Sequence, residues 1–392
     1  MLNPCTHGAI IGAVDTEQKL EVLADASKFD LACACRFADE PGRTRGRDGR
    51  WVYPAVLPSG RKVMLLKTLQ SNACVNDCAY CPFNRTRDMA RCSLGPDTLA
   101  RTFMDLLRAN RVSGLFLSSG VPDTPDRTME QMLGTVEILR RRFAFRGYIH
   151  LKVIPGASQA SIEQAVRMAT RVSVNIEAPT AERLARLSTR KRFYEDIIST
   201  MQTIADLRGR LNRRCHQTTQ FVVGAAGETD REIVTATARL YERFRMERVY
   251  FSAYQDPLGR SAPAQPALFS DAPMPRAKGR AHETFVREHR LYQVDFLLRK
   301  YGFSRQDILF DEDGNLSLGE DPKTRWARLH PDFYPVPVNT ADPSQLLRVP
   351  GIGPVGAKRI VEARRHGRLH GLEDLQGLCV RSRVARPYVR FA

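Results

Sequence analysis

Short apolar runs alternate with longer amphipathic stretches along most of the chain after about residue 60. The apolar runs are rich in Val, Ile, Leu and Phe, which is typical of buried strands. Between them, apolar positions recur at helical spacing. The predicted strands are 62–68, 114–118, 148–154, 171–176, 217–223 and 248–253, and the predicted helices between them are 97–110, 127–143, 158–169, 180–210 and 228–244.

This alternation predicts an α/β fold built from parallel β-α-β units. No nucleotide-type GxGxxG motif follows the first strand. We therefore favour a barrel-like arrangement over a doubly wound sheet. In such a barrel the functional residues lie at the C-terminal ends of the strands.

The chain outside these units has a different pattern. An amphipathic helix is predicted at 15–29, and a basic loop at 36–50 is either solvated or in contact with phosphate. A long helix is predicted at 279–301. The stretch 256–275 has five prolines and is a predicted loop, while 322–343 is predicted as a linker or an extended wrap. The expected organisation is an N-terminal helix and basic loop (1–59), a core barrel with its following helix (60–320), a linker (321–341) and a small helical module (342–392).

Three cysteines lie within eight residues just after the first predicted strand, as Cys74-Val-Asn-Asp-Cys78-Ala-Tyr-Cys81. Thiolates at this C-x3-C-x2-C spacing converge on one metal centre when the chain loops around it. A structural zinc ion needs a fourth ligand, and no C-x2-C partner pair occurs elsewhere. We expect a [4Fe–4S] cluster with one open iron, the alternative being three ordinary buried cysteines. Cys33 and Cys35 leave open whether an auxiliary cluster is present.

A second motif, Val-Pro-Gly-Ile-Gly-Pro, lies between two predicted helices in the segment 342–365. Gly351 and Gly353 have no side chains, so they leave backbone amides uncovered at a helix N-terminus, where anions bind. Lys358 and Arg359 lie about one turn further on and add positive charge. These four residues are predicted to bind phosphate groups, the alternative being a hairpin used for packing or protein contact.

Charge and composition support a soluble protein with a polyanionic partner. The chain has 60 Lys and Arg against 43 Asp and Glu, a net charge of +17, and 43% hydrophobic residues. This basic balance favours nucleic acid, although a merely solvated basic surface is the alternative. No run of 18 uncharged apolar residues occurs and the N-terminus lacks the pattern of a secretory signal, so we expect a cytoplasmic protein without a membrane partner.

The cysteine run, with Tyr80 immediately before the last cysteine, resembles the signature of the radical S-adenosylmethionine (SAM) superfamily. The resemblance implies a partial (β/α)6 TIM-like barrel whose cofactors are a [4Fe–4S] cluster and SAM, with Tyr80 beside them. In that family the open iron chelates the amino and carboxylate groups of SAM. The reduced cluster then cleaves SAM to methionine and a 5′-deoxyadenosyl radical, which abstracts a hydrogen atom from the substrate.

Two strand ends are similar to SAM-binding motifs of this superfamily. Ser118, Ser119 and Gly120 end the second predicted strand, where the superfamily has a Gly-Gly-Glu type motif. Val121 stands here in place of the glutamate, so any contact with the SAM amino group comes from the backbone. Asn175-Ile-Glu177 ends the fourth strand and resembles the Asn-x-Glu of lipoyl and biotin synthases; the alternative is a solvated strand end or a helix cap.

The fifth strand ends in a third such motif, which resembles the superfamily's Gly-x-Gly-Glu-Thr turn. Gly224 and Gly227 permit close approach of the backbone to the adenosine. Glu228 and Thr229 are equally well interpreted as caps of the next helix.

The C-terminal motif resembles the helix-hairpin-helix of DNA repair enzymes, which implies that Gly351, Gly353, Lys358 and Arg359 contact the DNA backbone without reading bases. Together with the cysteine loop and the segment Leu-Ala-Asp-Ala-Ser-Lys-Phe-Asp at 23–30, it resembles a family of DNA modification or repair radical SAM proteins, often encoded beside a uracil-DNA-glycosylase-like partner. This resemblance also implies an electron donor such as flavodoxin or ferredoxin.

Three functions follow as hypotheses. The first is a radical SAM enzyme that modifies or repairs a nucleotide in DNA, reached by base flipping or in a single strand. The second is an enzyme with the same chemistry that acts on RNA or tRNA, although no RRM or KH signature is present. The third is a non-enzymatic iron–sulfur sensor that binds DNA.

Overall fold

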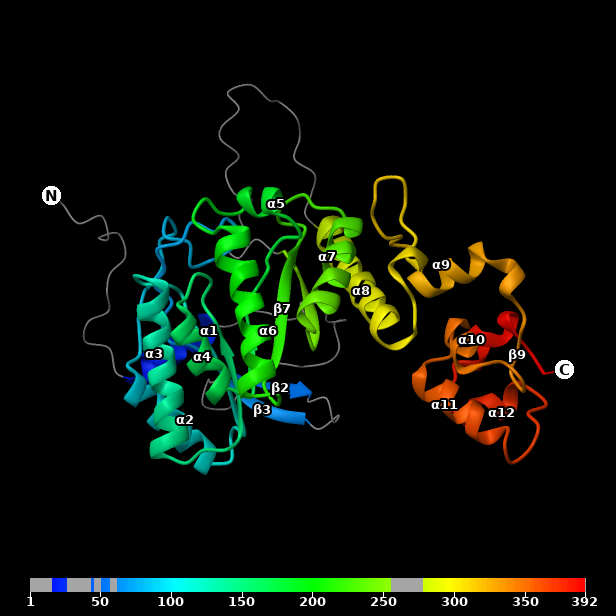
Figure 1. Ribbon diagram of the computed structural model, residues 1–392, viewed down its shortest axis with the longest axis horizontal. Helices are drawn as coiled ribbons and strands as arrows, with labels where there is room; N and C mark the ends of the chain where they lie inside the picture. The colour runs from blue at the N-terminus through cyan, green and yellow to red at the C-terminus, as the bar shows by residue number, and fades with distance from the viewer. Residues whose placement is uncertain (1–15, 27–43, 46–50, 57–61, 255–277, 392) are drawn as a thin grey trace, which may run out of the picture. The chain divides into compact units, whose positions relative to one another are not determined.

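The computed structural model describes residues 16–26, 44–45, 51–56, 62–254 and 278–391 (Figure 1). The Cys33-Ala-Cys35 pair, most of the basic segment 36–50 and the proline-rich stretch 256–275 lie outside the described residues. The chain divides into two compact units, of which one comprises Met1–Glu228 with Arg239–Ala277, and the other Thr229–Ala238 with Lys278–Ala392.

The first unit contains a sheet of eight strands that follow one another in chain order. Its strands are β1 Thr44–Arg45, β2 Trp51–Val56, β3 Lys62–Leu69, β4 Gly114–Ser118, β5 Tyr148–Lys152, β6 Arg171–Ser173, β7 His216–Val223 and β8 Arg248–Ala253. The strands β1, β2 and β3 pair antiparallel, whereas β3 to β8 pair in parallel. All six predicted strands are present, and the predicted partial (β/α)6 barrel is confirmed.

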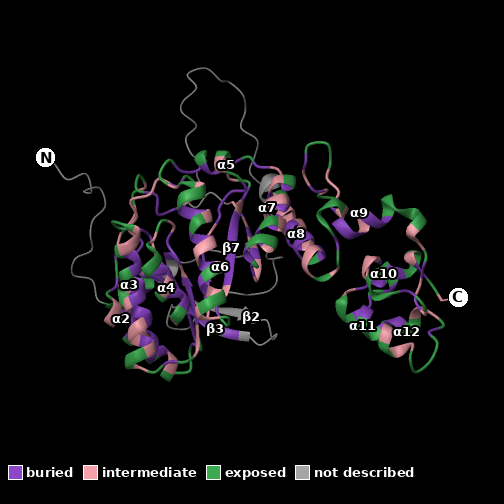
Figure 2. Cartoon of the chain, in the orientation of Figure 1, coloured by how far each residue is buried: buried purple, intermediate pink, exposed green. Residues whose placement is uncertain are grey.

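Helices connect the parallel strands and cover the outside of the sheet (Figure 1). They are α2 Pro96–Arg108, α3 Pro125–Glu137 with its π-helical extension Ile138–Arg142, α4 Gln159–Met168, α5 Ala181–Ala185, α6 Ser199–Leu211 and α7 Asp230–Phe244. The helix α1 Thr16–Ala26 packs on β3. Figure 2 shows buried residues running through the strands and along one side of the surrounding helices, as amphipathic helices on a sheet require.

The continuous helix predicted over 180–210 is wrong in its middle. After α5 the chain runs as a loop from Arg186 to Arg192, makes a π-helical turn at Phe193–Ile198 and only then enters α6. The loop departs from helical geometry because its polar groups bond elsewhere. Ser188 Oγ and the Thr189 backbone N–H both donate to the carboxylate of Asp77, which lies in the cysteine loop.

The second unit is mainly helical. Its elements are α8 Lys278–Lys300, α9 Pro322–Leu329, β9 Val336–Pro337, α10 Pro343–Arg348, α11 Pro354–Ala363, α12 Leu372–Gln376, α13 Ser382–Ala385 and β10 Val389–Arg390, with 3-10 turns at Arg305–Asp307, Pro331–Phe333 and Arg386–Tyr388. Leu346, Ile352, Ile360 and Leu375 lie in one hydrophobic core of the last sixty residues. The helix pair predicted around the glycines is therefore present.

Part of the segment predicted as a linker or extended wrap is helical. Asp321 caps α9 by accepting hydrogen bonds from the backbone N–H groups of Lys323 and Thr324. Trp326 of this helix is buried, and its ring centroid lies 4.6 Å from the guanidinium carbon of Arg348 in α10. The sequence pattern missed the helix because it is short and flanked by prolines. The boundaries at 60, 321 and 342 stay predictions.

Among the described residues, no helix is both long and apolar enough to cross a membrane.

Candidate functional site

The three clustered cysteines lie on the long loop between β3 and α2, at the C-terminal end of the first parallel strand. The guanidinium of Arg91 organises this loop by donating to four of its carbonyls. The acceptors are Asn72 (2.7 Å), Phe83 (3.0 Å), Asn84 (3.0 Å) and Arg87 (2.9 Å). A loop without regular structure is thereby held in one conformation.

The chemistry of the three thiols fits an iron–sulfur cluster. Cys78 is buried, and Cys74 and Cys81 are partly buried. Burial, followed by the neighbouring thiols of Cys78 and Cys74, raises the pKa of Cys81 to about 12. Ionised together, the three sulfurs therefore repel one another, and a cationic iron centre removes that repulsion.

No three His, Cys, Asp or Glu side chains in the described part of the chain converge closely enough to hold a single metal ion. Each thiolate of a [4Fe–4S] cluster binds a different iron, so the sulfur ligands stand further apart than around one ion. A set of three thiols is therefore compatible with a [4Fe–4S] cluster.

The turn after β4 packs directly against the cysteine loop. The Gly120 N–H donates to the Ser71 carbonyl at 2.7 Å, and a Cβ atom at Gly120 would stand 2.3 Å from the Ala73 carbonyl oxygen and 3.3 Å from Cys74 Cβ. Glycine is therefore needed here for close approach. Ser118 and Ser119 precede it, and Ser119 Oγ lies 3.5 Å from the Ser71 carbonyl.

Asn175 and Glu177 follow β6 at the same end of the sheet. The backbone of Glu177 is left-handed, with a φ of 64°, which is costly for a residue with a Cβ atom. It is held there because its N–H donates to Gln220 and its carbonyl accepts from Val222. Its carboxylate is buried, and the Asn175 amide lies 3.4 Å from it.

Lys191 joins this carboxylate to the cysteine loop. Its ammonium donates to Glu177 Oε1 at 3.1 Å and to the Tyr80 hydroxyl at 2.9 Å. The Lys191 side chain is 13% exposed and that of Glu177 is 6% exposed, so this ion pair is largely screened from water. Although burial acts to lower it, negative charge at Cys78 and Glu177 raises the pKa of Lys191, which keeps the ammonium charged.

Sequence analysis missed Lys191. The run Arg190-Lys191-Arg192 fell inside the predicted helix 180–210, where a basic triplet indicates only a solvated face. One sequence feature could have indicated a role at this site. Lys191 follows Asn175-Ile-Glu177 within fifteen residues, in a polar stretch that also contains Ser188 and Thr189.

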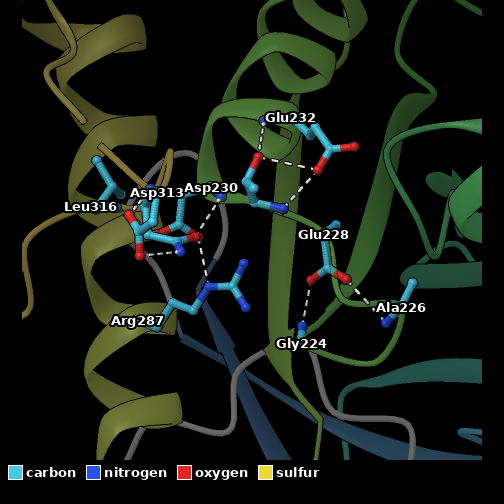
Figure 3. A network of polar contacts seen from close by, with 10 residues as sticks. Gly224, Ala226, Glu228, Asp230, Glu232, Arg287, Asp313 and Leu316 are labelled. Carbon is cyan, nitrogen blue, oxygen red and sulfur yellow. Dashed lines mark hydrogen bonds and ion pairs between the residues drawn. The ribbon is translucent and has the colours of Figure 1, made fainter. Parts of the chain in front are cut away.

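The turn after β7 is stabilised by Glu228. Its buried carboxylate accepts from the backbone N–H groups of Gly224 (2.5 Å) and Ala226 (3.0 Å), as Figure 3 shows. Gly224 and Gly227 have φ angles of 90° and 66°, which favour glycine. Glu228 thus stabilises the turn itself.

The next helix has its own cap. The Thr229 N–H donates to Glu232 Oε2 at 2.7 Å, and the Glu232 N–H donates to the Thr229 hydroxyl at 3.3 Å (Figure 3). This reciprocal pair is a capping box, so Thr229 caps α7, as the alternative interpretation of the sequence predicted.

These observations place the predicted cofactor residues at one edge of the sheet. The turn at Gly120 touches the cysteine loop directly, and Glu177 reaches it through Lys191 and Tyr80. The turn at Gly224 and Gly227 follows β7, whose Val222 bonds the Glu177 carbonyl. These residues therefore come together at the C-terminal ends of the parallel strands, which is where the functional residues of such barrels lie.

The second candidate site is the hairpin between α10 and α11. Gly351 has a φ of 85°, and a Cβ atom there would stand 2.7 Å from the Arg381 carbonyl oxygen. Gly353 caps α11, and Lys358 and Arg359 are exposed on that helix. The Arg359 guanidinium lies 2.6 Å from Cys379 Sγ. The hairpin therefore presents a helix N-terminus and two cations on one short element.

A buried lysine that was not predicted from the sequence forms a hydrogen bond with the turn of this hairpin. Lys323 of α9 donates to the Ile352 carbonyl at 2.6 Å, between the two glycines of the turn. Burial lowers the pKa of Lys323 to about 7.

Comparison with known protein families matches two regions of the chain. Residues 69–240 match the model of the Radical SAM superfamily, and residues 333–378 match that of a helix-hairpin-helix motif. No curated protein matches the chain.

Several solved structures are similar over part of the chain. The FeFe-hydrogenase maturase HydG from Carboxydothermus hydrogenoformans is 14% identical, with a TM-score of 0.43 over 58% of this chain and 51% of that one. Methylornithine synthase (PylB) is 14% identical, with a TM-score of 0.42 over 59% and 63%. The radical SAM methyltransferase TsrM from Kitasatospora setae is 16% identical, with a TM-score of 0.39 over 64% and 47%. The chain thus spans less than two thirds of each of these proteins.

Proposed function

Since the chain carries a radical SAM domain at residues 69–240 and a helix-hairpin-helix motif at residues 333–378, we propose that it is a radical SAM enzyme that modifies or repairs a nucleotide in DNA. The radical SAM domain uses a [4Fe–4S] cluster and SAM. When reduced, the cluster supplies the electron that cleaves SAM to methionine and a 5′-deoxyadenosyl radical.

In this proposal Cys74, Cys78 and Cys81 hold the cluster through three thiolates. Gly120 lets the turn at Ser118 and Ser119 lie against the cysteine loop, so that backbone carbonyls of this turn face the SAM amino group.

The remaining contacts to SAM come from the neighbouring strand ends. Asn175 and Glu177 offer acceptors to its hydroxyl groups, and Lys191 holds the Glu177 carboxylate in place. Gly224 and Gly227 leave room for the adenosine at the end of β7. Tyr80 closes the site beside Cys81.

The proposal rests on one observation: the chain contains both the cysteine loop and an exposed hairpin, between α10 and α11, of the kind that binds phosphate. Gly351 and Gly353 expose the N-terminal amides of α11, and Lys358 and Arg359 lie on its solvent side. A helix N-terminus with nearby cations binds the phosphate backbone and positions it without sequence preference. The net charge of +17 is consistent with such a partner.

Single Cys→Ala variants at positions 74, 78 and 81 test the chemistry. Each is expected to lose the iron–sulfur absorbance and the formation of 5′-deoxyadenosine after reduction. Cys92 provides the matched control, because it is a buried cysteine on the same loop whose backbone N–H bonds Asn72. A variant of the triplet that keeps a four-iron cluster and normal SAM cleavage would contradict the assignment.

Competition between duplex DNA and tRNA in a gel-shift assay tests the substrate. Preferential displacement by duplex DNA supports the proposal, whereas preferential displacement by tRNA favours an RNA-modifying enzyme. A protein that binds DNA and cluster but forms no 5′-deoxyadenosine is the non-enzymatic sensor. Mass spectrometry of nucleosides from cells with and without the gene then identifies the product.

Three further elements belong to the same proposal. They are a cytoplasmic location, reduction by a flavodoxin or ferredoxin, and cooperation with a uracil-DNA-glycosylase-like protein. Co-purification of the tagged full chain with these proteins tests the last two.

A further inference from the structure

The π-helical turn directly after the loop Arg186–Arg192 carries an exposed aromatic side chain. Tyr194 is 64% exposed, the highest fraction among the large hydrophobic side chains that the structure describes. It lies in the π-helical turn Phe193–Ile198, three residues after Lys191. Single π-helical turns are frequent at functional sites.

Three separate contacts fix this loop to the cysteine loop. Asp77 accepts hydrogen bonds from Ser188 and Thr189, and the Ala79 N–H donates to the Leu187 carbonyl at 2.8 Å. Lys191 reaches the Tyr80 hydroxyl. Three residues span at most about 10 Å, so the Cα atom of Tyr194 lies within about 10 Å of that of Lys191, which contacts the cysteine loop.

The Tyr194 ring is held in position although it is exposed. Arg192 donates from its backbone N–H and its guanidinium to the buried carboxylate of Asp196, which fixes the start of the π-helical turn. The ring of Phe193 meets that of Tyr194 edge to face, with centroids 5.2 Å apart. A fixed aromatic face loses little conformational entropy when a flat ligand stacks on it.

Two exposed arginines, one on the loop Arg186–Arg192 and one on the cysteine loop, have guanidinium groups without a partner among the described residues. Arg190 lies between Thr189 and Lys191, both of which bond the cysteine loop, and its side chain is exposed. Arg85 is exposed on the cysteine loop, where its N–H donates to the Asn76 carbonyl. By contrast, the nearby Arg186 forms an ion pair with Glu182. One exposed carboxylate, that of Glu195, follows Tyr194 directly in the sequence.

We propose that Tyr194 is a stacking platform for an unpaired nucleobase, with Arg190 and Arg85 binding the flanking phosphates. An exposed aromatic ring, with unpaired arginines on its own segment and on the loop bonded to that segment, matches how proteins bind single-stranded nucleic acid. A paired base is shielded by its neighbours in the duplex and offers no free face. This inference rests on the proposed function and narrows its substrate to a nucleotide that is flipped, bulged or single-stranded.

The test measures affinity in the full-length protein with its cluster, by fluorescence anisotropy. The probes are a labelled single-stranded oligonucleotide, a duplex with one bulged nucleotide, and the fully paired duplex. Tyr194→Leu removes the aromatic face from an exposed position, so the fold is retained. Stacking contributes about 1–3 kcal/mol per base, so binding of the first two probes is expected to weaken by roughly 5- to 150-fold. Binding of the paired duplex is expected to stay unchanged, and Tyr194→Phe, which keeps the ring, to restore the affinity.

Arg190→Ala tests the phosphate contact. It is expected to reduce the slope of log affinity against log salt by about 0.7 on the single-stranded probe. Arg210→Ala is the matched control, because Arg210 is an exposed arginine in the last turn of α6, which leads to the opposite end of the sheet.

The inference would be overturned if Tyr194→Leu bound each of the three probes with the same affinity as the unchanged protein. If binding of paired duplex then still depended on Lys358 and Arg359, the proposed function would stand without it. A protein that binds none of the three probes would overturn both. If the unchanged protein preferred single-stranded RNA over DNA of the same sequence, the stacking role of Tyr194 would stand, but the proposed DNA substrate would be replaced by RNA.

Discussion

Removal of the Asp77 carboxylate is expected to release the loop Arg186–Arg192 from the cysteine loop. Asp77 accepts a hydrogen bond of 2.6 Å from Ser188 Oγ and further bonds from the Thr189 N–H and hydroxyl. Asp77→Asn keeps the shape of the side chain but removes its charge and one acceptor oxygen. The loop then retains the Ala79–Leu187 backbone bond and the Lys191 contacts.

The size of this effect follows from the acidity of the group. Burial acts to raise the pKa of Asp77. The hydrogen bonds from Ser188 and Thr189 outweigh burial and lower this pKa from its usual 3.8 to about 2. This difference corresponds to about 2.4 kcal/mol, and solvent screening of a partly exposed group reduces it to about 1–2 kcal/mol. Because the pKa is lowered in the folded protein, the stabilisation is present above about pH 4 and is lost as the pH falls through about 2.

Hydrogen exchange measured by mass spectrometry on the holo protein tests this expectation. Loss of about 1–2 kcal/mol of local stability makes the amides of Ala79, Thr189 and Arg190 exchange about 5- to 30-fold faster in Asp77→Asn. Asp105→Asn is the control, because its pair with Arg108 is largely exposed, and no change is expected there. Unchanged exchange in the Asp77 variant would refute the idea that this carboxylate holds the two loops together.

Three further outcomes are expected. Gly120→Ala should lower the iron content of the reconstituted protein, because its Cβ displaces the cysteine loop, whereas Gly209→Ala, with open space around the new Cβ, should not. Glu177→Ala should weaken SAM binding about tenfold or more, since a hydrogen bond to a charged group contributes about 1.5–3 kcal/mol; an unchanged dissociation constant in calorimetry would remove it from the site. Lys358→Ala combined with Arg359→Ala should weaken binding to unrelated duplexes and lower the salt slope by about 1.8, and an unchanged slope would place DNA elsewhere.

The sequence predicted the fold where a single signal dominated. The six strands from β3 to β8 are largely buried, and each coincides with its predicted range to within about three residues. The strand β2, Trp51–Val56, was missed because it contains a proline and lies in a basic, glycine-rich region. The helix predicted over 180–210 failed because Ser188 and Thr189 bond Asp77, more than a hundred residues away. Local periodicity carries no information about such a distant partner.

The candidate site was predictable only as far as motifs reach. The cysteine spacing and the glycines at 120 and 351 are visible in the sequence, and the structure explains both glycines by close backbone contacts. The left-handed backbone of Glu177 and its ion pair with Lys191 depend on how β6, β7 and the following loop come together. Such contacts arise from tertiary structure.

The most direct test of radical chemistry on DNA is the transfer of hydrogen from DNA to SAM-derived 5′-deoxyadenosine. The reduced holo enzyme is incubated with SAM and DNA from cells grown in heavy water, and the 5′-deoxyadenosine is analysed by mass spectrometry. Deuterium is expected in the product with deuterated DNA, and none with unlabelled DNA. Formation of 5′-deoxyadenosine that never carries deuterium from DNA, but gains it from deuterated tRNA, would contradict a DNA substrate, and no 5′-deoxyadenosine at all would contradict the radical SAM activity itself.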